Sequence, residues 1–140
     1  MNRSANNSFG LPRDYVCSQE IFDRETKSIF STHWLCLARL SELKNGLLPI
    51  EFENHKLVVV QSDDGTVKAF RNFCRHRGSQ LVTESNCEQL GQRIQCPYHA
   101  WTYDRNGRLM SAPNMEGIVG FNKDEFGLLE VACAVAAGFV

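Results

Sequence analysis

The chain has 140 residues, a formal net charge of −1 and a pI near 6.4. This length allows one domain that buries a core without disulfide bonds, and the near-neutral charge argues against nucleic acid or an anionic membrane surface as a partner. Residues 1–14 are polar, and because neither a secretory signal nor an apolar run of about 18 residues is visible, we expect a cytoplasmic protein with no membrane partner.

Residues 18–34 show the periodicity of an amphipathic helix. Ser18 is a suitable N-cap, and Glu20 and Asp23 place acidic side chains in or near the first turn. One face of this helix carries Phe22, Thr26, Ile29, Phe30 and His33. We expect that face to pack on a sheet, and His33 to have a structural role at the helix end.

From residue 35 onward the apolar periodicity changes to two, which is typical of β-strands. Short strands are expected at residues 35–39, 49–53, 56–61, 67–70, 93–95, 101–103 and 128–132. Turn-forming residues separate these strands, and the clearest hairpin has Asp64-Gly65 between two apolar runs. His55 is expected in another turn, exposed to solvent. Many short strands after one helix predict a mostly β architecture of antiparallel strands.

Two short motifs carry the chemistry of the chain. Cys74 and His76 form a Cys-x-His motif, Cys96 and His99 form a Cys-x2-His motif, and residues 77–95 lie between them. Two such loops brought face to face present two thiols and two imidazoles, the ligand set of a Rieske 2Fe-2S centre, with two thiolates on one iron and two imidazoles on the other. Because imidazole is neutral, the reduction potential of such a centre is raised to roughly −150 to +300 mV, against about −400 mV for an all-Cys cluster. The motifs therefore predict one-electron transfer.

A structural zinc site is the alternative, since tetrahedral zinc also accepts two Cys and two His. Zinc patterns usually pair Cys with Cys and His with His, whereas the two residue types alternate here. The spacing therefore favours the iron-sulfur centre over a zinc-stabilised interaction module.

Four further cysteines have no partner in a motif: Cys17, Cys36, Cys87 and Cys133. Without a secretory signal, cysteines indicate metal binding rather than a disulfide framework. Cys36 and Cys133 have apolar neighbours and are predicted to be small buried hydrophobes. Cys87 belongs to the polar segment 82–92, which we expect to cross the surface, and its thiol is predicted to be exposed.

The residues around the two motifs suggest how the loops are supported. Gly78 permits a tight turn after the first motif, and Pro97 stiffens the second. Trp101 and Tyr103 alternate after His99 and are expected to form an aromatic backing to the second loop. Arg75 and Arg77 flank His76, and we expect them to be docking charges at the rim of the site.

The surrounding sequence resembles the Rieske domain of ring-hydroxylating oxygenase large (alpha) subunits, a family that includes choline monooxygenase-like enzymes. The resemblance rests on Cys-Arg-His-Arg-Gly at residues 74–78, on Cys-Pro-Tyr-His-Ala-Trp at 96–101, and on a similar lead that begins at Leu11. Free Rieske ferredoxins tend to have Cys-Pro-x-His-Gly in the second loop. Cytochrome bc-type Rieske proteins add a disulfide-forming Cys to each loop. The residues here are Ser79 and Tyr98, and neither is a Cys.

The resemblance implies a Rieske fold with hairpin loops that hold a [2Fe-2S] cluster, with Cys74 and Cys96 on the inner iron and His76 and His99 on the outer iron. It implies an oxidoreductase, a monooxygenase or dioxygenase, that receives electrons from a reductase or ferredoxin. Those electrons would pass to a mononuclear Fe(II) site in a catalytic domain of the same or a neighbouring subunit of a homo-oligomer. Such an iron needs two His and one carboxylate, and the two remaining His, His33 and His55, both precede the cluster motifs.

We therefore expect an N-terminal fragment of a larger oxygenase subunit, with no catalytic residues of its own and no oxygenase activity alone. The expected organisation is a lead with one helix at residues 1–42 and a Rieske domain at residues 43–140, with the final strand truncated and the catalytic domain absent. A stand-alone Rieske ferredoxin-like electron carrier is the alternative. The first loop and the helical lead favour the oxygenase module, and the missing catalytic half favours the carrier.

Overall fold

The structure, a computed structural model, describes residues 10–88 and 90–140 and divides the chain into two units, Met1–Cys36 and Leu37–Val140. The beginning of the predicted polar lead and one residue of the predicted surface segment 82–92 lie outside the described residues. Across the part described, no helix is both long and apolar enough to cross a bilayer. The division of the chain into domains at residues 42 and 43 stays a prediction.

The first unit contains three consecutive helical pieces. The first, α1 (Asp14–Cys17), precedes the predicted helix and was not predicted. The predicted helix is formed by α2 (Gln19–Glu25) and a π-helical turn, η1 (Thr26–Phe30). The predicted N-cap is confirmed, because the Ser18 hydroxyl accepts a hydrogen bond from the Ile21 N–H at 3.4 Å. The helix ends at Phe30, before the predicted limit. Thr32 Oγ1 donates to the Ser28 carbonyl at 2.6 Å, so a side chain replaces the next helical N–H at that carbonyl. The expectation that the apolar helix face packs on a sheet stays a prediction.

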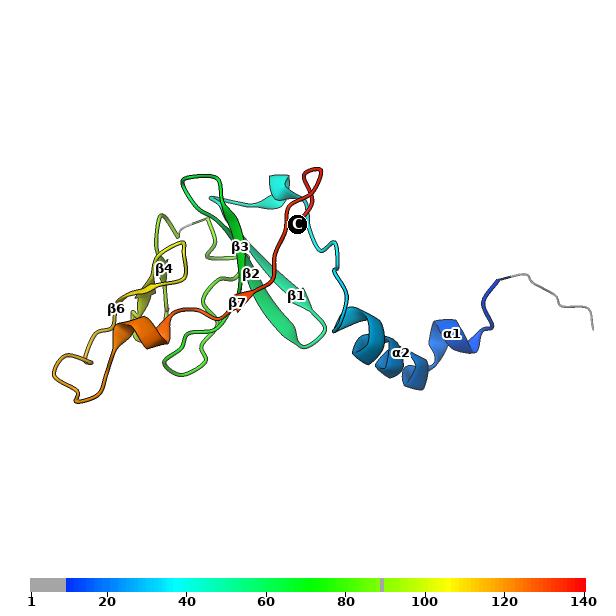
Figure 1. Cartoon of the computed structure of the whole chain (residues 1–140), viewed down its shortest axis with the longest axis horizontal. Coiled ribbons are helices and arrows are strands. Elements are labelled where there is room, and N and C mark those ends of the chain that lie inside the picture. Colours follow the sequence, from blue (N-terminus) through cyan, green and yellow to red (C-terminus); the bar gives the residue numbers. More distant parts are fainter. Residues whose placement is uncertain (1–9, 89) are drawn as a thin grey trace, which may run out of the picture. The chain divides into compact units, whose positions relative to one another are not determined.

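The second unit contains two antiparallel sheets (Figure 1). The larger sheet has the order β1-β2-β3-β7, from β1 (Leu47–Phe52), β2 (His55–Gln61), β3 (Val67–Arg71) and β7 (Glu130–Val131). The smaller sheet has the order β4-β5-β6, from β4 (Ile94–Gln95), β5 (Thr102–Tyr103) and β6 (Leu109–Ser111). Two short 3-10 turns, η2 (Leu40–Glu42) and η3 (Lys123–Phe126), lie in the connections. The predicted mostly β, antiparallel fold is confirmed.

Three local predictions differ from the structure. Residues 35–39 form no regular strand; instead the Leu37 N–H donates to the Val140 carbonyl and the Val140 N–H donates to the Ala38 carbonyl, at 3.0 and 2.9 Å. Strand β6 was not predicted. His55 begins β2 instead of lying in a solvated turn, and its Nδ1 accepts a hydrogen bond from the Arg71 guanidinium at 2.8 Å.

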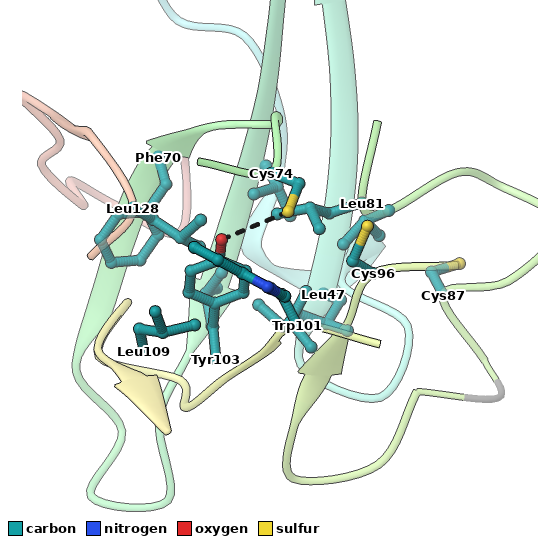
Figure 2. Packing of buried hydrophobic residues seen from close by; sticks show 14 of the residues in the cluster. Leu47, Phe70, Cys74, Leu81, Cys87, Cys96, Trp101, Tyr103, Leu109 and Leu128 are labelled. Carbon is teal, nitrogen blue, oxygen red and sulfur yellow. Dashed lines mark hydrogen bonds between the residues drawn. The ribbon is translucent and has the colours of Figure 1, made fainter. Parts of the chain in front are cut away.

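One apolar core joins the two sheets (Figure 2). Buried side chains from the larger sheet are Leu47, Val58, Val60 and Phe70, and those from the smaller sheet are Ile94, Tyr103 and Leu109. The loops between strands add Leu81, Val82, Trp101 and Leu128 to the same cluster, together with the thiols of both motifs. The two motifs therefore lie against the core.

The unassigned cysteines are placed differently from the prediction in two cases. Cys87 is buried in the core, because the turn that begins at Thr83 directs it inward, with the Cys87 N–H donating to the Thr83 carbonyl at 3.0 Å. Cys36 is exposed at the end of the first unit, and Cys133 is half-buried. Apolar neighbours in sequence did not determine burial at Cys36, because its neighbours lie in irregular backbone without a common buried face.

Candidate metal centre

The two motif loops are built on the same backbone pattern. In each loop the Cys N–H donates to the carbonyl five positions later, from Cys74 to Ser79 and from Cys96 to Trp101, both at 2.8 Å. In each loop the Cys carbonyl accepts from the N–H four positions later, which belongs to Gly78 in the first loop at 2.9 Å and to Ala100 in the second at 3.1 Å.

The residue four positions after each Cys has a left-handed backbone, with φ of 72° at Gly78 and 58° at Ala100. Glycine adopts this conformation without strain, whereas alanine pays about 1 to 2 kcal/mol for it. The predicted tight turn at Gly78 is confirmed. The matching turn at Ala100 could not be predicted, because an alanine gives no such signal.

The four predicted ligands lie in two close pairs. The Cys74 and Cys96 side chains are buried in the core, each only 3% exposed, and their sulfur atoms lie side by side (Figure 2). The rings of His76 and His99 are half-buried, with centroids 4.9 Å apart and planes inclined by 62°. The buried side of the site therefore offers sulfur, and its outer side offers nitrogen.

Within residues 10–88 and 90–140, no group of three or more His, Cys, Asp or Glu side chains is arranged to hold a single metal ion. A tetrahedral zinc site would gather all four ligands around one point. A Rieske cluster instead takes two protein ligands on each of two irons, which matches the arrangement of these four side chains in two pairs.

Tyr103 contacts the buried thiol pair. Its hydroxyl lies 3.4 Å from Cys74 Sγ and accepts a hydrogen bond from the Arg75 N–H at 3.0 Å. Burial raises the pKa of the Cys74 thiol, and the adjoining Cys96 thiol raises it further, while hydrogen bonds from Tyr103 and the His76 N–H lower it. The free thiol is thus held protonated, and metal binding must release its proton.

His76 offers a ring nitrogen with no protein partner. Its Nδ1 is buried, and no protein group hydrogen-bonds to it. Burial lowers the pKa of His76, as do the nearby positive charges of His99 and Arg77, so the neutral imidazole that binds metals is favoured. A buried ring nitrogen without a hydrogen bond is costly in a protein that holds no ligand there, and it fits an iron ligand.

Aromatic rings fix the orientation of His76. The Trp101 ring stacks on it with centroids 4.8 Å apart and planes only 5° apart, and Phe121 and Phe126 pack edge-on against Trp101 at 5.8 and 5.7 Å. Trp101 is buried, as predicted, but it and Tyr103 contact residues of the first loop, not only the second. Phe121 and Phe126 were not predicted, because they follow a long irregular segment.

A comparison with protein families matches residues 33–123 to the Rieske [2Fe-2S] domain. The chain belongs to the Rieske [2Fe-2S] domain family. The cofactor of this domain is therefore a Rieske-type [2Fe-2S] cluster, as the motif spacing predicts.

The curated proteins similar to this chain are oxygenase components. The chain is 34% identical to the glycine betaine monooxygenase oxygenase subunit of Pseudomonas aeruginosa, over 100% of this chain and 32% of that protein. It is 35% identical to the carnitine monooxygenase oxygenase subunit of Escherichia coli, over 93% of this chain and 35% of that protein. This Rieske domain thus spans about a third of the length of these relatives, which are oxidoreductases, and the predicted resemblance is confirmed.

A solved structure agrees with this assignment. The chain matches a quaternary ammonium Rieske monooxygenase whose structure is described as giving insight into carnitine oxidation and inter-subunit electron transfer. The TM-score is 0.79 at 32% identity, over 91% of this chain and 35% of that one. The Rieske fold is thus confirmed beyond the stretch that the family comparison matches.

Proposed function

We propose that this chain is the electron-transfer module of a Rieske oxygenase large subunit, with Cys74 and Cys96 as ligands of one iron and His76 and His99 as ligands of the other. The observation that carries the proposal is the arrangement of these four residues in two pairs on matching loops, with buried thiols on one side and half-exposed imidazoles on the other. When bound, the cluster supplies one-electron transfer at a higher potential than an all-Cys cluster would.

The chain's own residues determine the environment of that centre. The core excludes water from the two thiols, and the Tyr103 hydroxyl donates a hydrogen bond toward Cys74, which disperses negative charge on a thiolate. The Trp101 ring holds the plane of His76. The outer imidazoles are therefore the groups through which an electron would enter or leave.

An electron donor, a reductase or a ferredoxin, is proposed as the first partner. Tyr98 is 61% exposed and stacks on His99 with centroids 3.8 Å apart, and Arg77 is exposed beside His76. An acidic surface on the donor would be attracted to the positive charge of Arg77 and would pack on the exposed Tyr98 ring, next to the two imidazoles. No basic surface for nucleic acid is proposed, since the net charge of the chain is −1.

The electron acceptor is proposed to be a mononuclear iron in a catalytic domain of the same subunit or of a neighbouring subunit in a homo-oligomer. Of the four His in the sequence, two are assigned to the cluster. His33 lies in the other unit of the chain, and His55 is engaged by Arg71. A quaternary ammonium compound is the proposed substrate class of the whole protein, because the names of the two relatives above specify glycine betaine and carnitine.

The test of the ligand set is the iron and acid-labile sulfide content of the chain assembled without air, with the EPR spectrum of the dithionite-reduced protein. Two irons and two sulfides with a Rieske-type signal are expected. His76→Cys and His99→Cys should each keep a cluster of lower potential, because an anionic ligand replaces a neutral one. An unchanged potential, or bound zinc in the wild-type chain, contradicts the assignment.

A further inference from the structure

Asn72 is a polar residue inside the core, two residues before Cys74 of the first motif. It is 1% exposed, and the only other buried polar residue in the described part of the chain is Thr102. Burial of an amide side chain costs free energy unless its hydrogen bonds are made. The contacts of Asn72 therefore indicate why the core contains an amide there.

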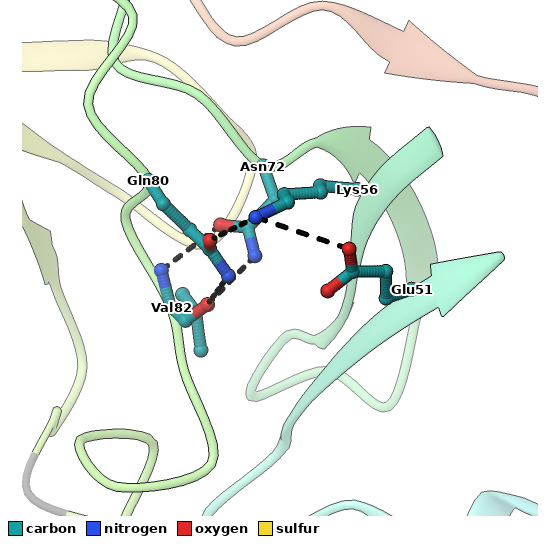
Figure 3. A network of polar contacts seen from close by, with 5 residues as sticks. All are labelled: Glu51, Lys56, Asn72, Gln80 and Val82. Carbon is teal, nitrogen blue, oxygen red and sulfur yellow. Dashed lines mark hydrogen bonds and ion pairs between the residues drawn. The ribbon is translucent and has the colours of Figure 1, made fainter. Parts of the chain in front are cut away.

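The Asn72 side chain binds one residue in both directions (Figure 3). Its Nδ2 donates to the Val82 carbonyl at 2.7 Å, and its Oδ1 accepts from the Val82 N–H at 2.9 Å. The Asn72 backbone N–H donates to the Lys56 carbonyl at 2.9 Å. The side-chain amide thus takes the place of a peptide group in an antiparallel pair, and it joins residue 72 to residue 82 across the loop that contains Cys74 and His76.

The two motif loops differ in how their ends are closed. The second loop is closed by strand pairing, because β4 and β5 pair Ile94 with Tyr103 and Gln95 with Thr102. The first loop has an isolated bridge between Phe73 and Gln80, and outside it the Asn72 side chain makes the next connection. A side chain therefore does for the first loop what a strand pair does for the second.

A second set of contacts connects this closure to the larger sheet. Gln80 Nε2 donates to the Val82 carbonyl at 3.2 Å, and Lys56 Nζ donates to Gln80 Oε1 at 3.1 Å (Figure 3). Lys56 Nζ also lies 3.9 Å from the Glu51 carboxylate. These contacts connect the end of the first loop to β1 and β2. They therefore fix the position of the loop on the larger sheet, in addition to holding its two ends together.

We infer that Asn72 is a positioning residue for the iron-sulfur cluster: it fixes the separation of the two ends of the first loop, so that Cys74 and His76 face Cys96 and His99. The inference rests on the proposed function, because it assumes those four ligands. Asn72 touches no proposed ligand atom, and it acts through the backbone of the loop.

The experiment compares the wild-type chain with its cluster assembled and the variant Asn72→Leu, which keeps the number and branching of the side-chain heavy atoms and removes the hydrogen bonds. Asn86→Leu is the control, because Asn86 also makes two side-chain hydrogen bonds, from Nδ2 to the Leu81 carbonyl at 3.1 Å and to Oδ1 from the Thr83 N–H at 2.7 Å, but these do not connect the two ends of the first loop. The readouts are the rate of cluster loss to an iron chelator, the EPR g values of the reduced cluster, and the urea midpoint.

Asn72→Leu should lose its cluster about tenfold faster, as is usual when a residue that orients metal ligands is removed, and its EPR g values should shift or broaden. Asn86→Leu should lower the urea midpoint without changing the EPR spectrum. If Asn72→Leu has the g values of the wild type and loses its cluster at the wild-type rate, the inference is overturned, whatever the urea midpoint of the variant.

If Asn72→Leu does not fold, Gln80→Leu decides the question, because it loosens the same end of the loop from a half-buried position. A smaller acceleration of cluster loss with a shifted EPR signal supports the inference, and wild-type behaviour in Gln80→Leu overturns it. If the wild-type chain assembles no iron and sulfide, the proposed ligand set is overturned. The role of Asn72 in positioning the cluster is then overturned as well.

Discussion

Tyr103 is fully buried, and its hydroxyl joins Cys74 to the Arg75 backbone. Burial is the main cause that raises the pKa of Tyr103 above its usual value near 10, and the contact with Cys74 raises it further. The unfolded chain therefore loses this proton at lower pH than the folded chain. Stability from this group is complete below about pH 10 and falls by about 1.4 kcal/mol for each pH unit above it.

Tyr103→Phe should remove that alkaline loss of stability, and at pH 7 it should cost about 1 to 3 kcal/mol, because the Arg75 N–H is left without its partner. Urea unfolding of the wild-type chain and the variant between pH 7 and 11 measures both effects. Tyr98→Phe is the control, since the Tyr98 ring is largely exposed. If the Tyr103→Phe and wild-type curves stay parallel through pH 11, the raised pKa is wrong.

The role of Trp101 can also be measured by substitution. Its ring is 1% exposed and packs between His76 and two Phe rings, so Trp101→Ala should lower the free energy of unfolding by about 3 to 5 kcal/mol. Trp101→Phe should cost less, because Trp101 Nε1 makes no hydrogen bond within the protein. Trp34→Ala, at a position 72% exposed, should stay within about 0.5 kcal/mol of wild type. Equal losses in the two alanine variants would contradict the packing.

At the scale of the element, the sequence predicted regular segments well and connections poorly. The hairpin at Asp64-Gly65 was predictable because the Thr66 N–H bonds back to the Asp64 carboxylate at 2.9 Å, a purely local turn. Strand β6 was missed because Leu109, Met110 and Ser111 show no alternation of apolar and polar residues. His55 was misplaced because its partner, Arg71, is on the neighbouring strand and sixteen positions away.

The same distinction applies to the site. The spacing of Cys and His predicts the four candidate ligands, since a motif is local. The contacts of Asn72 with Val82 and of Tyr103 with Cys74 span ten and twenty-nine positions, and only the fold brings those groups together. An Asn two residues before a Cys motif was the one available signal, and a single sequence does not distinguish a buried Asn there from a turn residue.

Arg105 connects elements that are distant in the sequence. Its Nη1 donates to the Gln61 carbonyl at 2.7 Å, and its Nη2 donates to the carbonyls of Asn45 and Gly91 at 2.6 and 2.9 Å. One guanidinium therefore joins the start of β1, the end of β2 and the segment before β4 to the turn between β5 and β6. Hydrogen bonds from a charged donor contribute about 1.5 to 3 kcal/mol each.

Gly46→Ala should break this connection. Gly46 has φ of 73°, and a Cβ built there would collide with Arg105 Nη1. Gly65→Ala is the matched control, because Gly65 has φ of 83° with open space around it. Both variants should lose about 1 to 2 kcal/mol from the backbone, and Gly46→Ala should lose more because the guanidinium must move. Equal urea midpoints for the two variants would show that Arg105 adapts without cost.

At the scale of the whole second unit, the two motif loops belong to different sheets. The first loop follows β3 of the larger sheet, and the second connects β4 to β5 of the smaller one. Between the sheets lies the shared core, which contains both thiols. A cluster held by both loops therefore joins the sheets directly, in addition to their apolar contact.

Removal of the cluster should destabilise the smaller sheet most. Strands β4 and β5 share only two residue pairs, whereas β1 and β2 share six, so the smaller sheet depends more on its attachment to the rest. A group that binds only the folded state raises stability, and each kcal/mol lost should lower the melting temperature by about 4 to 8 °C for a unit of this size.

Amide hydrogen exchange before and after chelation should show faster exchange at Cys96 and Ala100 and in β4 and β5, with β2 nearly unchanged. Cys133→Ser, outside both loops, should behave like wild type in both states. Uniform acceleration across both sheets would mean that the cluster stabilises the unit as a whole and does not act as a joint between its sheets.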